Sequence, residues 1–320
     1  MPGPDNRPLI ALAIGDPAGI SPELTARILV HEEVQAAARL LVIGDRRVLD
    51  DGAAIAGVEL DVEPVADAGA LMMSGRTAML QGGLLDPATV QRGVATREGG
   101  IFALANYRAA LDLAAAQRVD AVCFTPFNKA AMKLADTSYG DDIVYTAATL
   151  GVTGPASEFN VLGALWNARV TSHIPLSEVA SRITEAAVLR GIRLTDTSLR
   201  AAGFPAPRIA VAALNPHAGD GGNFGREEID IIEPAVRQAQ ADQIRVEGPF
   251  PSDTVFLRAR SGAFDAVLTM YHDQGQIAMK LMGFDRGVTF LGGFDFPICT
   301  PAHGTAYEIA GKGMADVGAA

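Results

Sequence analysis

The apolar run 209–214 (IAVAAL) passes directly into a glycine-rich loop, 215–225 (NPHAGDGGNFG). An uninterrupted apolar run bounded by turn residues predicts a strand buried on both faces, which is typical of a parallel sheet covered by helices. In such α/β sheets, ligands bind at the carboxyl ends of the strands. We therefore expect this loop to present Asn215 and His217 at a ligand-binding edge of the sheet.

Two other histidines follow predicted strands in the same way. His173 follows the run 168–172, and His272 follows the run 265–271. Because the carboxyl ends of parallel strands share one edge, His173, His217 and His272 are candidates for converging on one divalent metal ion, and three protein ligands leave positions open as in a catalytic site. The alternative for each is a loop histidine that only makes hydrogen bonds.

The first half of the chain repeats the strand–loop–helix order. Residues 9–14 predict a strand that enters GDPAGISPE (15–23), where Ser21 is expected to cap a helix. Residues 120–125 predict a further strand, which would deliver Lys129 to the same edge; the alternative is a solvated lysine at a helix start. Residues 176–189 have the spacing of one amphipathic helix. The pattern predicts an α/β fold.

Composition limits the partners and the location. The 320 residues carry a formal charge of −11, which argues against nucleic acid or an anionic membrane as partner, since those surfaces attract clustered Lys and Arg. Cys123 and Cys299 lie in apolar surroundings, so we expect free thiols in a reducing compartment. The first apolar segment is too short for a signal peptide or a membrane span. A cytoplasmic protein is expected.

Four strings occur in a recognisable order: GDPAGISPE at 15–23, TSHIPL at 171–176, NPHAGDGG at 215–222 and YHDQGQ at 271–276. They resemble the motifs of the 4-hydroxythreonine-4-phosphate dehydrogenase family, over nearly the whole chain. HGTAYEIAGKG at 303–313 is similar to the cofactor-loop motif of the wider isocitrate and isopropylmalate dehydrogenase superfamily. That superfamily binds NAD by this loop, which accounts for the missing G-x-G-x-x-G string.

The resemblance implies two α/β/α domains of the isocitrate/isopropylmalate dehydrogenase-like type, with the active site in the cleft between them. We expect residues 1–138 plus 304–320 in the first domain. Residues 139–303 would form the second, with the metal histidines and the dimer interface. It also implies a homodimer with shared active sites, in which one metal histidine is donated by the partner.

The implied reaction is oxidation of a secondary alcohol of a hydroxy acid by NAD or NADP, followed by decarboxylation. His173, His217 and His272 would bind one divalent ion (Zn, Mg, Mn or Co) that favours the alkoxide. Asp253, Asp273 and Lys129 are the catalytic candidates, to orient ligands or move a proton. The cofactor-binding residues implied by the loop motif are His303, Gly304, Thr305, Ala306, Glu308 and Gly311.

Departures from the family pattern bear on the substrate. Asp141 and Asp142 stand where members acting on phosphorylated substrates have His and Thr, and Thr289 and Ile298 stand where they have Asn and Arg, downstream of the retained Lys280. A phosphate would lose its Arg and meet two carboxylates. We therefore expect an unphosphorylated diol or hydroxy acid, such as the dihydrodiol of terephthalate, hydrogen-bonded by the aspartates.

Three alternatives remain open at this point. The substrate is 4-hydroxythreonine 4-phosphate, as in pyridoxal phosphate biosynthesis; or the chain is a non-catalytic binding protein on the same fold; or the two aspartates only face solvent. Intact metal and cofactor motifs argue against the binding protein, because a non-catalytic descendant has no need to keep both.

Overall fold

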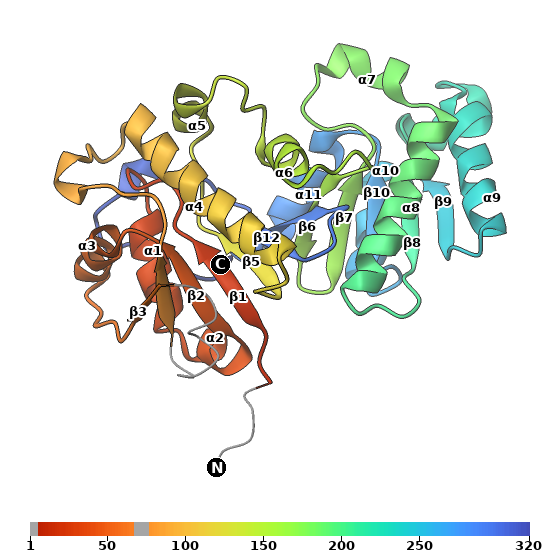
Figure 1. The fold of residues 1–320 in the computed structure, drawn as a ribbon. Helices are drawn as coiled ribbons and strands as arrows, with labels where there is room; N and C mark the ends of the chain where they lie inside the picture. Colours follow the sequence, from red (N-terminus) through yellow and green to blue (C-terminus); the bar gives the residue numbers. More distant parts are fainter. Residues whose placement is uncertain (1–5, 67–76) are drawn as a thin grey trace. The chain divides into compact units, whose positions relative to one another are not determined.

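The computed structural model describes residues 6–66 and 77–320, which form two compact units (Figure 1). Unit 1 is Met1–Thr153 with Phe294–Ala320, and unit 2 is Gly154–Gly293. The boundaries expected from the sequence lay at 138/139 and 303/304. Residues 142–150 belong to unit 1 because their helix packs on an earlier one, where the buried Tyr107 hydroxyl lies 2.6 Å from Thr146 Oγ1.

Unit 1 is built on parallel strands in the order β3-β4-β2-β1-β5-β12. The strands are β1 (Leu9–Ala13), β2 (Arg39–Gly44), β3 (Glu63–Val65), β4 (Ala78–Gln81), β5 (Ala121–Phe124) and β12 (Ile298–Pro301). Its helices are α1 (Ser21–Leu29), α2 (Glu32–Ala37), α3 (Arg46–Ala56), α4 (Arg97–Ala115), α5 (Lys129–Ala135) and α6 (Asp142–Leu150), with the 3-10 turns η2 (Pro87–Thr89) and η6 (Tyr307–Ile309). The almost completely buried β1 lies at the centre, as its apolar run predicts.

Unit 2 has the strand order β11-β6-β7-β10-β8-β9. The strands are β6 (Ser157–Leu162), β7 (Leu165–Arg169), β8 (Ile209–Ala212), β9 (Val246–Phe250), β10 (Ala266–Thr269) and β11 (Val288–Gly292). β11, β6 and β7 pair antiparallel, whereas β7, β10, β8 and β9 pair parallel. The parallel part brings the carboxyl ends of β7, β10 and β8 to one edge, as the three histidine positions require.

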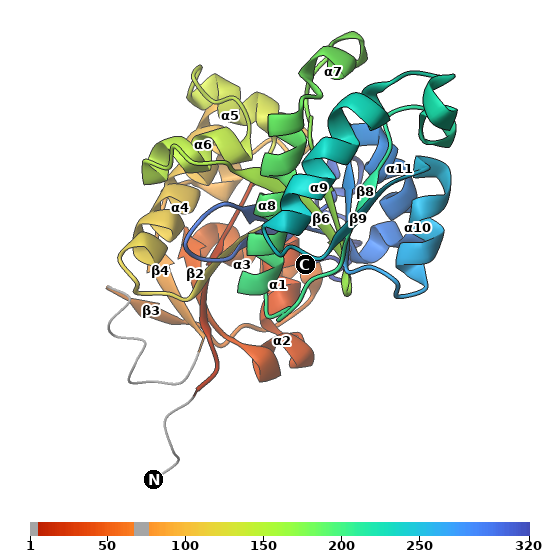
Figure 2. The same ribbon diagram turned by 90° about the vertical axis from the view of Figure 1, so that its right-hand side faces the viewer.

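Helices cover both faces of these parallel strands. Alternate residues of β8 and β10, such as Val211 and Leu268, pack with α8 and α9, which lie side by side in Figure 2. The residues between them, such as Ala210 and Val267, pack with α10 and α11. The helices are α7 (Leu176–Arg182), α8 (Glu185–Ala201), α9 (Glu233–Ala241), α10 (Ser252–Arg260) and α11 (His272–Gly283), with the shorter η3 (Pro216–Gly222), η4 (Glu228–Ile232) and η5 (Phe284–Arg286). The two faces explain why these strands read as continuous apolar runs.

Two local expectations were wrong. Residues 176–189 form parts of two helices, because the Thr184 side chain accepts a hydrogen bond from Ala187 N and starts α8 anew, while Ile183 is extended. Ser21 does not cap α1 but is its first residue, and its hydroxyl donates to Pro126 O at 2.8 Å. Hydrogen bonding to another segment replaced the local cap in this case.

The two cysteines are neighbours in the fold. Cys123 of β5 and Cys299 of β12 are partners in the strand register, and both are free thiols. Burial raises the pKa of Cys123 to about 11 and raises that of Cys299 still further. Both side chains therefore remain protonated thiols near neutral pH.

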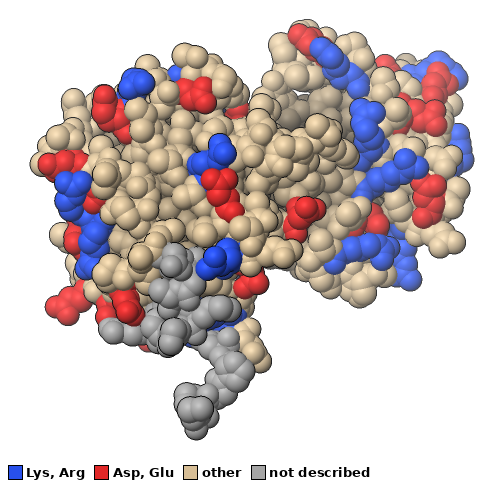
Figure 3. Space-filling model, viewed as in Figure 1, with Lys and Arg blue, Asp and Glu red and all other residues tan. Residues whose placement is uncertain are grey.

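Charged side chains of both signs share the surface. On the face shown in Figure 3, Lys and Arg lie among Asp and Glu. Several are paired one helical turn apart, as Arg226 is with Asp230 at 2.8 Å. Within the described residues, no helix combines the length and the apolar character that crossing a membrane would require.

Replacing Gly52 with alanine is expected to destabilise unit 1. A Cβ at this position would lie 2.2 Å from the backbone oxygen of Pro22, which α1 cannot move freely. We expect Gly52→Ala to lower the free energy of unfolding by about 1–3 kcal/mol, although alanine is the better helix former. Urea denaturation measures the change.

The control is Gly191→Ala in α8, where the added Cβ would have side-chain methyl groups rather than backbone atoms as its nearest neighbours, those of Leu268 at 3.2–3.3 Å and of Val170 at 3.8 Å. This variant should stay close to the wild type in stability. A Gly52→Ala protein as stable as Gly191→Ala would contradict the close packing of α1 on α3.

Candidate active site

Two of the three predicted metal histidines lie together at the edge of unit 2. His173 follows β7 and His272 begins α11, and their ring centroids are 5.6 Å apart. His272 Nδ1 lies 2.7 Å from Asp273 Oδ1. A carboxylate on Nδ1 favours the tautomer that leaves Nε2 for a ligand, which is the usual arrangement of a metal-binding histidine. These donors fit a divalent ion in chemistry and position.

His217 lies in an unusual loop. Residues 217–221 all have positive φ, including the non-glycine residues His217 (52°), Ala218 (55°) and Asp220 (45°). Each left-handed non-glycine residue costs about 1–2 kcal/mol, and such strain gathers at functional sites. However, no group of three or more His, Cys, Asp or Glu among the described residues is placed to hold a metal ion. A three-histidine site within one chain is therefore not observed.

A buried carboxylate holds the start of this loop. Glu228 is 1% exposed and accepts hydrogen bonds from Leu214 N (2.9 Å), Asn215 N (2.7 Å) and Asn215 Nδ2 (3.0 Å). Glu227 accepts from the same Nδ2 at 2.7 Å. The amide of Asn215, predicted to contact substrate, thus donates to two carboxylates of its own chain. Neither glutamate was predicted from the sequence as a site residue. The only sequence signal for them was their position as an acid pair just after the glycine-rich loop.

A second buried network, also missed, joins the segments that carry the histidine pair. The guanidinium of Arg169 donates to Glu158 (2.6 Å), Asn160 (2.7 Å) and Ser172 (3.0 Å), the residue before His173. Gln276 of α11 donates to the same Asn160 oxygen at 2.6 Å. Burial lowers the pKa of Arg169, and the adjacent Glu158 opposes that effect. The network ties the end of β7 to the helix that carries His272.

Four further catalytic and substrate candidates occupy exposed or half-buried positions. Asp253 is in the first turn of α10, Lys280 in the last turn of α11, and Lys129 is the first residue of α5, all exposed. Asn128, not Lys129, caps α5 by accepting from two backbone N–H groups. Thr289 is half-buried in β11.

The predicted cofactor segment of unit 1 follows β12 directly. Gly304 and Glu308 are exposed, and a Cβ added at Gly304 would meet nothing within 4 Å. Ala306 has a left-handed φ of 45° and Gly311 one of 75°. Thr305 is buried, and its backbone carbonyl oxygen accepts a hydrogen bond from Ile20 N at 3.0 Å. The segment is thus held on one side and open on the other, which fits the approach of a dinucleotide to its backbone.

The residues that argued against a phosphorylated substrate serve the chain's own structure. Asp141 caps α6 by accepting from Val144 N at 2.9 Å, and Asp142 accepts the hydroxyl hydrogen bond of Tyr139. Ile298 is fully buried in β12. Two carboxylates engaged in local contacts and a core isoleucine give no ground for excluding phosphate.

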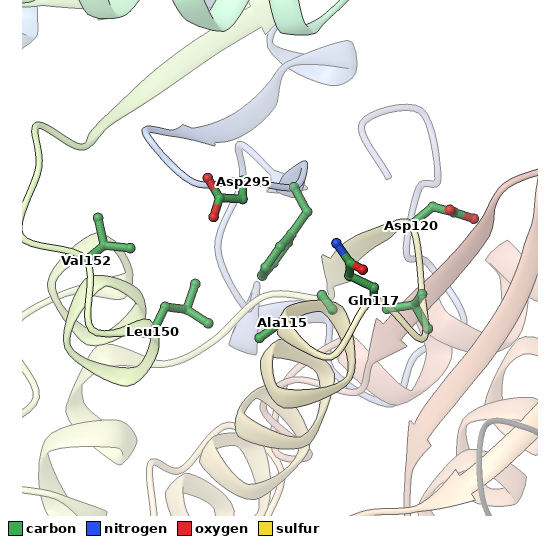
Figure 4. Close-up of a pocket in the computed structure, with 9 residues that line it drawn as sticks. Ala115, Gln117, Asp120, Leu150, Val152 and Asp295 are labelled. Atoms are coloured by element: carbon green, nitrogen blue, oxygen red, sulfur yellow. The ribbon is translucent and has the colours of Figure 1, made fainter.

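A separate hollow lies at the amino end of β5 (Figure 4). Its lining includes Gln117, Asp120, Leu150 and Asp295, none of which is a predicted site residue. Asp120 accepts from Leu9 N at 2.7 Å, so its carboxylate helps to position β1.

Comparison with known proteins shows close relatives. Residues 36–320 match the family model of the pyridoxal phosphate biosynthetic protein PdxA. A Rhizobium meliloti protein, provisionally named 4-hydroxythreonine-4-phosphate dehydrogenase 2, is 60% identical over 317 residues, which cover 98% of this chain and 91% of the relative. A Symbiobacterium thermophilum protein, provisionally named D-threonate 4-phosphate dehydrogenase, is 40% identical over 97% of this chain and 93% of its own.

Solved structures give the same result. The crystal structure of a 4-hydroxythreonine-4-phosphate dehydrogenase from Burkholderia phymatum has a TM-score of 0.84 at 35% identity, covering 98% of this chain and 96% of that one. The terephthalate 1,2-cis-dihydrodiol dehydrogenase from Burkholderia xenovorans has 0.67 at 28% identity, covering 98% and 94%. The expected α/β fold of this superfamily is confirmed.

The expectation of an unphosphorylated substrate was wrong, because the most similar relatives reported are named for phosphorylated ones and the terephthalate-dihydrodiol branch is less similar. Its physical basis, the two aspartates and Ile298, does not hold in the structure either. With a family model that matches most of its length and a relative at 60% identity, the chain belongs to the PdxA family.

Proposed function

We propose that this protein is an NAD- or NADP-dependent dehydrogenase that oxidises the secondary alcohol of 4-hydroxythreonine 4-phosphate. The observation that carries the proposal is the 60% identity, over 98% of the chain, to a relative with that name. The histidine pair with its Asp273 partner and the open cofactor segment support it. A second candidate substrate is D-threonate 4-phosphate, for which a relative at 40% identity is named.

The two candidate substrates would undergo the same reaction. Each has a four-carbon backbone with a carboxylate at one end, a phosphate at the other and a hydroxyl on the carbon β to the carboxylate. Transfer of hydride from that carbon to NAD or NADP, with loss of the hydroxyl proton, leaves a β-keto acid, which loses carbon dioxide readily. The candidates differ at the neighbouring carbon, which carries an amino group in one and a hydroxyl group in the other.

We infer further that one divalent ion per site is held by His173 and His272 of one chain and by His217 of the partner subunit. The neighbouring rings of His173 and His272 support this arrangement, as does the lack of a group of three possible ligands within the described part of the chain. When bound, such an ion lowers the pKa of the substrate hydroxyl and so favours loss of hydride. Asp273 would fix the ring of His272 through Nδ1, and Lys280 would supply a local positive charge to a phosphate.

The test is an assay of the purified protein with both phosphorylated acids, each with NAD and with NADP, beside the dephosphorylated acids as matched controls. We expect reduced cofactor to form with at least one phosphorylated acid, and carbon dioxide to form with it in equal amount. Equal turnover of a dephosphorylated acid would refute the phosphate requirement. Binding of substrate or cofactor without any turnover would support the non-catalytic alternative instead.

A site shared between two subunits leads to a separate prediction, on two exposed apolar residues of α11. Ile277 and Leu281 lie one turn apart on α11, 60% and 84% exposed in the single chain, on the helix that begins at His272. If the partner covers them, Ile277→Asp with Leu281→Asp is expected to give a monomer near 33.3 kDa with little activity. Light scattering measures the mass.

Leu257→Asp is the control, because Leu257 is similarly exposed, at 58%, on α10. It should leave the oligomeric state unchanged. An active monomer in the double variant would disprove the shared site.

A further inference from the structure

Asp16 is a buried carboxylate whose two oxygens both accept hydrogen bonds. The residue is 1% exposed and lies in the loop after β1. Oδ1 accepts from Ala18 N at 2.9 Å, which shapes the loop locally. Oδ2 accepts from the hydroxyl of Tyr307 at 2.5 Å, across 291 positions of sequence. The Asp16 loop is therefore connected directly to the 303–309 segment.

Other contacts join the same two segments. Ile20 N donates to Thr305 O at 3.0 Å, and Gly19 lies so close that an added Cβ would be 2.6 Å from this oxygen. Ala306, which lies between Thr305 and Tyr307 in the chain, has a left-handed φ of 45°, a conformation that needs support from its surroundings. Tyr307 supplies the only side-chain hydrogen bond among these contacts, and it is anchored at Asp16.

Burial disfavours the ionised form of the Asp16 carboxyl. Burial therefore raises the pKa of Asp16, while the hydrogen bonds from Tyr307 and Ala18 lower it. A buried carboxylate costs free energy that a surface residue would not. The contact is thus a specific one, and it holds a segment whose other side is open at Gly304 and Glu308.

We infer that Asp16 is a positioning residue for the cofactor: through Tyr307 it fixes the 303–309 segment in the conformation that binds the dinucleotide. A segment ordered in advance loses less entropy on binding, so the ligand is bound more tightly. The inference rests on the proposed function in one respect, namely that this segment binds NAD or NADP. Neither side chain needs to touch the cofactor for the effect.

Tyr307→Phe and Asp16→Asn test the inference, because the first removes only a hydroxyl and the second keeps the shape of the side chain. We expect each to raise the dissociation constant for NAD or NADP about tenfold, the usual effect of losing a hydrogen bond to a charged group. The double variant should lose no more than either single one, since both remove the same contact. Calorimetry measures the constants, and steady-state kinetics should show the change in KM rather than kcat.

Amide hydrogen exchange of the protein without cofactor gives a readout independent of catalysis. We expect residues 303–309 to exchange faster in both variants and the strands of unit 1 to be unchanged. Tyr145→Phe is the control, because Tyr145 is another half-buried tyrosine of unit 1 and lies on α6. Unchanged exchange and unchanged affinity in Tyr307→Phe would overturn the inference, as would additive losses in the double variant.

The outcomes separate the two proposals. A wild-type protein that binds neither NAD nor NADP refutes the proposed function and, with it, the role of Asp16 in cofactor binding. A wild-type protein that binds the cofactor, with variants that bind it equally well, refutes only the role of Asp16.

Discussion

His272→Ala is expected to lower kcat/KM by more than about 100-fold. Loss of a hydrogen-bonded partner of a metal ligand already costs about 10–100-fold, and this substitution removes both the proposed ligand and the target of Asp273. His173→Ala should have a similar effect, because the two rings are neighbours. The measurements are initial rates with saturating metal and the metal content of the dialysed protein.

Asp273→Asn and His31→Ala test whether the loss of activity comes from the proposed metal site. Asp273→Asn should reduce activity about 10–100-fold, because the ring of His272 is kept but loses its carboxylate. His31, at the start of α2 in unit 1, is remote from the proposed ligands in sequence and its alanine variant should keep its activity and metal content. Full metal content in both His272→Ala and His173→Ala would contradict the metal site, whatever the rates.

Arg169→Ala is expected to lower the free energy of unfolding by about 3–5 kcal/mol, the usual cost of breaking a buried ion pair. The side chain of Arg169 is 1% exposed and that of Glu158 13%, so the substitution leaves a mostly buried carboxylate without its cation. It also removes donors to Asn160 and Ser172. Because these donors brace the segments that carry His173 and His272, activity should fall as well. Urea denaturation gives the stability.

Two further variants test whether the loss of stability comes from leaving the buried carboxylate of Glu158 without its cation. Arg226→Ala removes one partner of an exposed pair and should leave the stability close to that of the wild type. Arg169→Met combined with Glu158→Gln removes the charge imbalance and should recover part of the stability lost in Arg169→Ala. A loss in Arg169→Ala no larger than that in Arg226→Ala would show that the buried pair does not stabilise unit 2.

Much of the site's framework was predictable because it depends on local patterns. Continuous apolar runs located β1, β8 and β10, since strands buried on both faces leave no polar positions. Turn residues at the ends of these strands predicted a ligand-binding edge. The structure places the rings of His173 and His272, after β7 and β10, 5.6 Å apart, and their role as metal ligands stays a prediction.

The failed expectations concern the partners of side chains, some distant in sequence and some only three residues away. Ser21 donates its hydroxyl hydrogen bond to Pro126 O instead of capping its own helix, and Ile298 is buried in β12, which pairs with β5 in the sheet. Asp141 and Asp142 looked like substitutions in a binding site, yet their hydrogen bonds are to α6 and Tyr139. The identity of a residue did not reveal the partner of its side chain, so these residues were wrongly taken as evidence against a phosphorylated substrate.

The sequence by itself determined the α/β class and the family motifs, because both are encoded in short stretches of chain. Only the tertiary structure decided where the two units divide, that residues 217–221 form a left-handed loop, and that buried charged side chains hold loops within each unit, Glu228 and Arg169 in unit 2 and Asp16 in unit 1. The physical reason is that a buried charge is stable only with specific partners. Those partners come from segments that the fold, and not the local sequence, brings together.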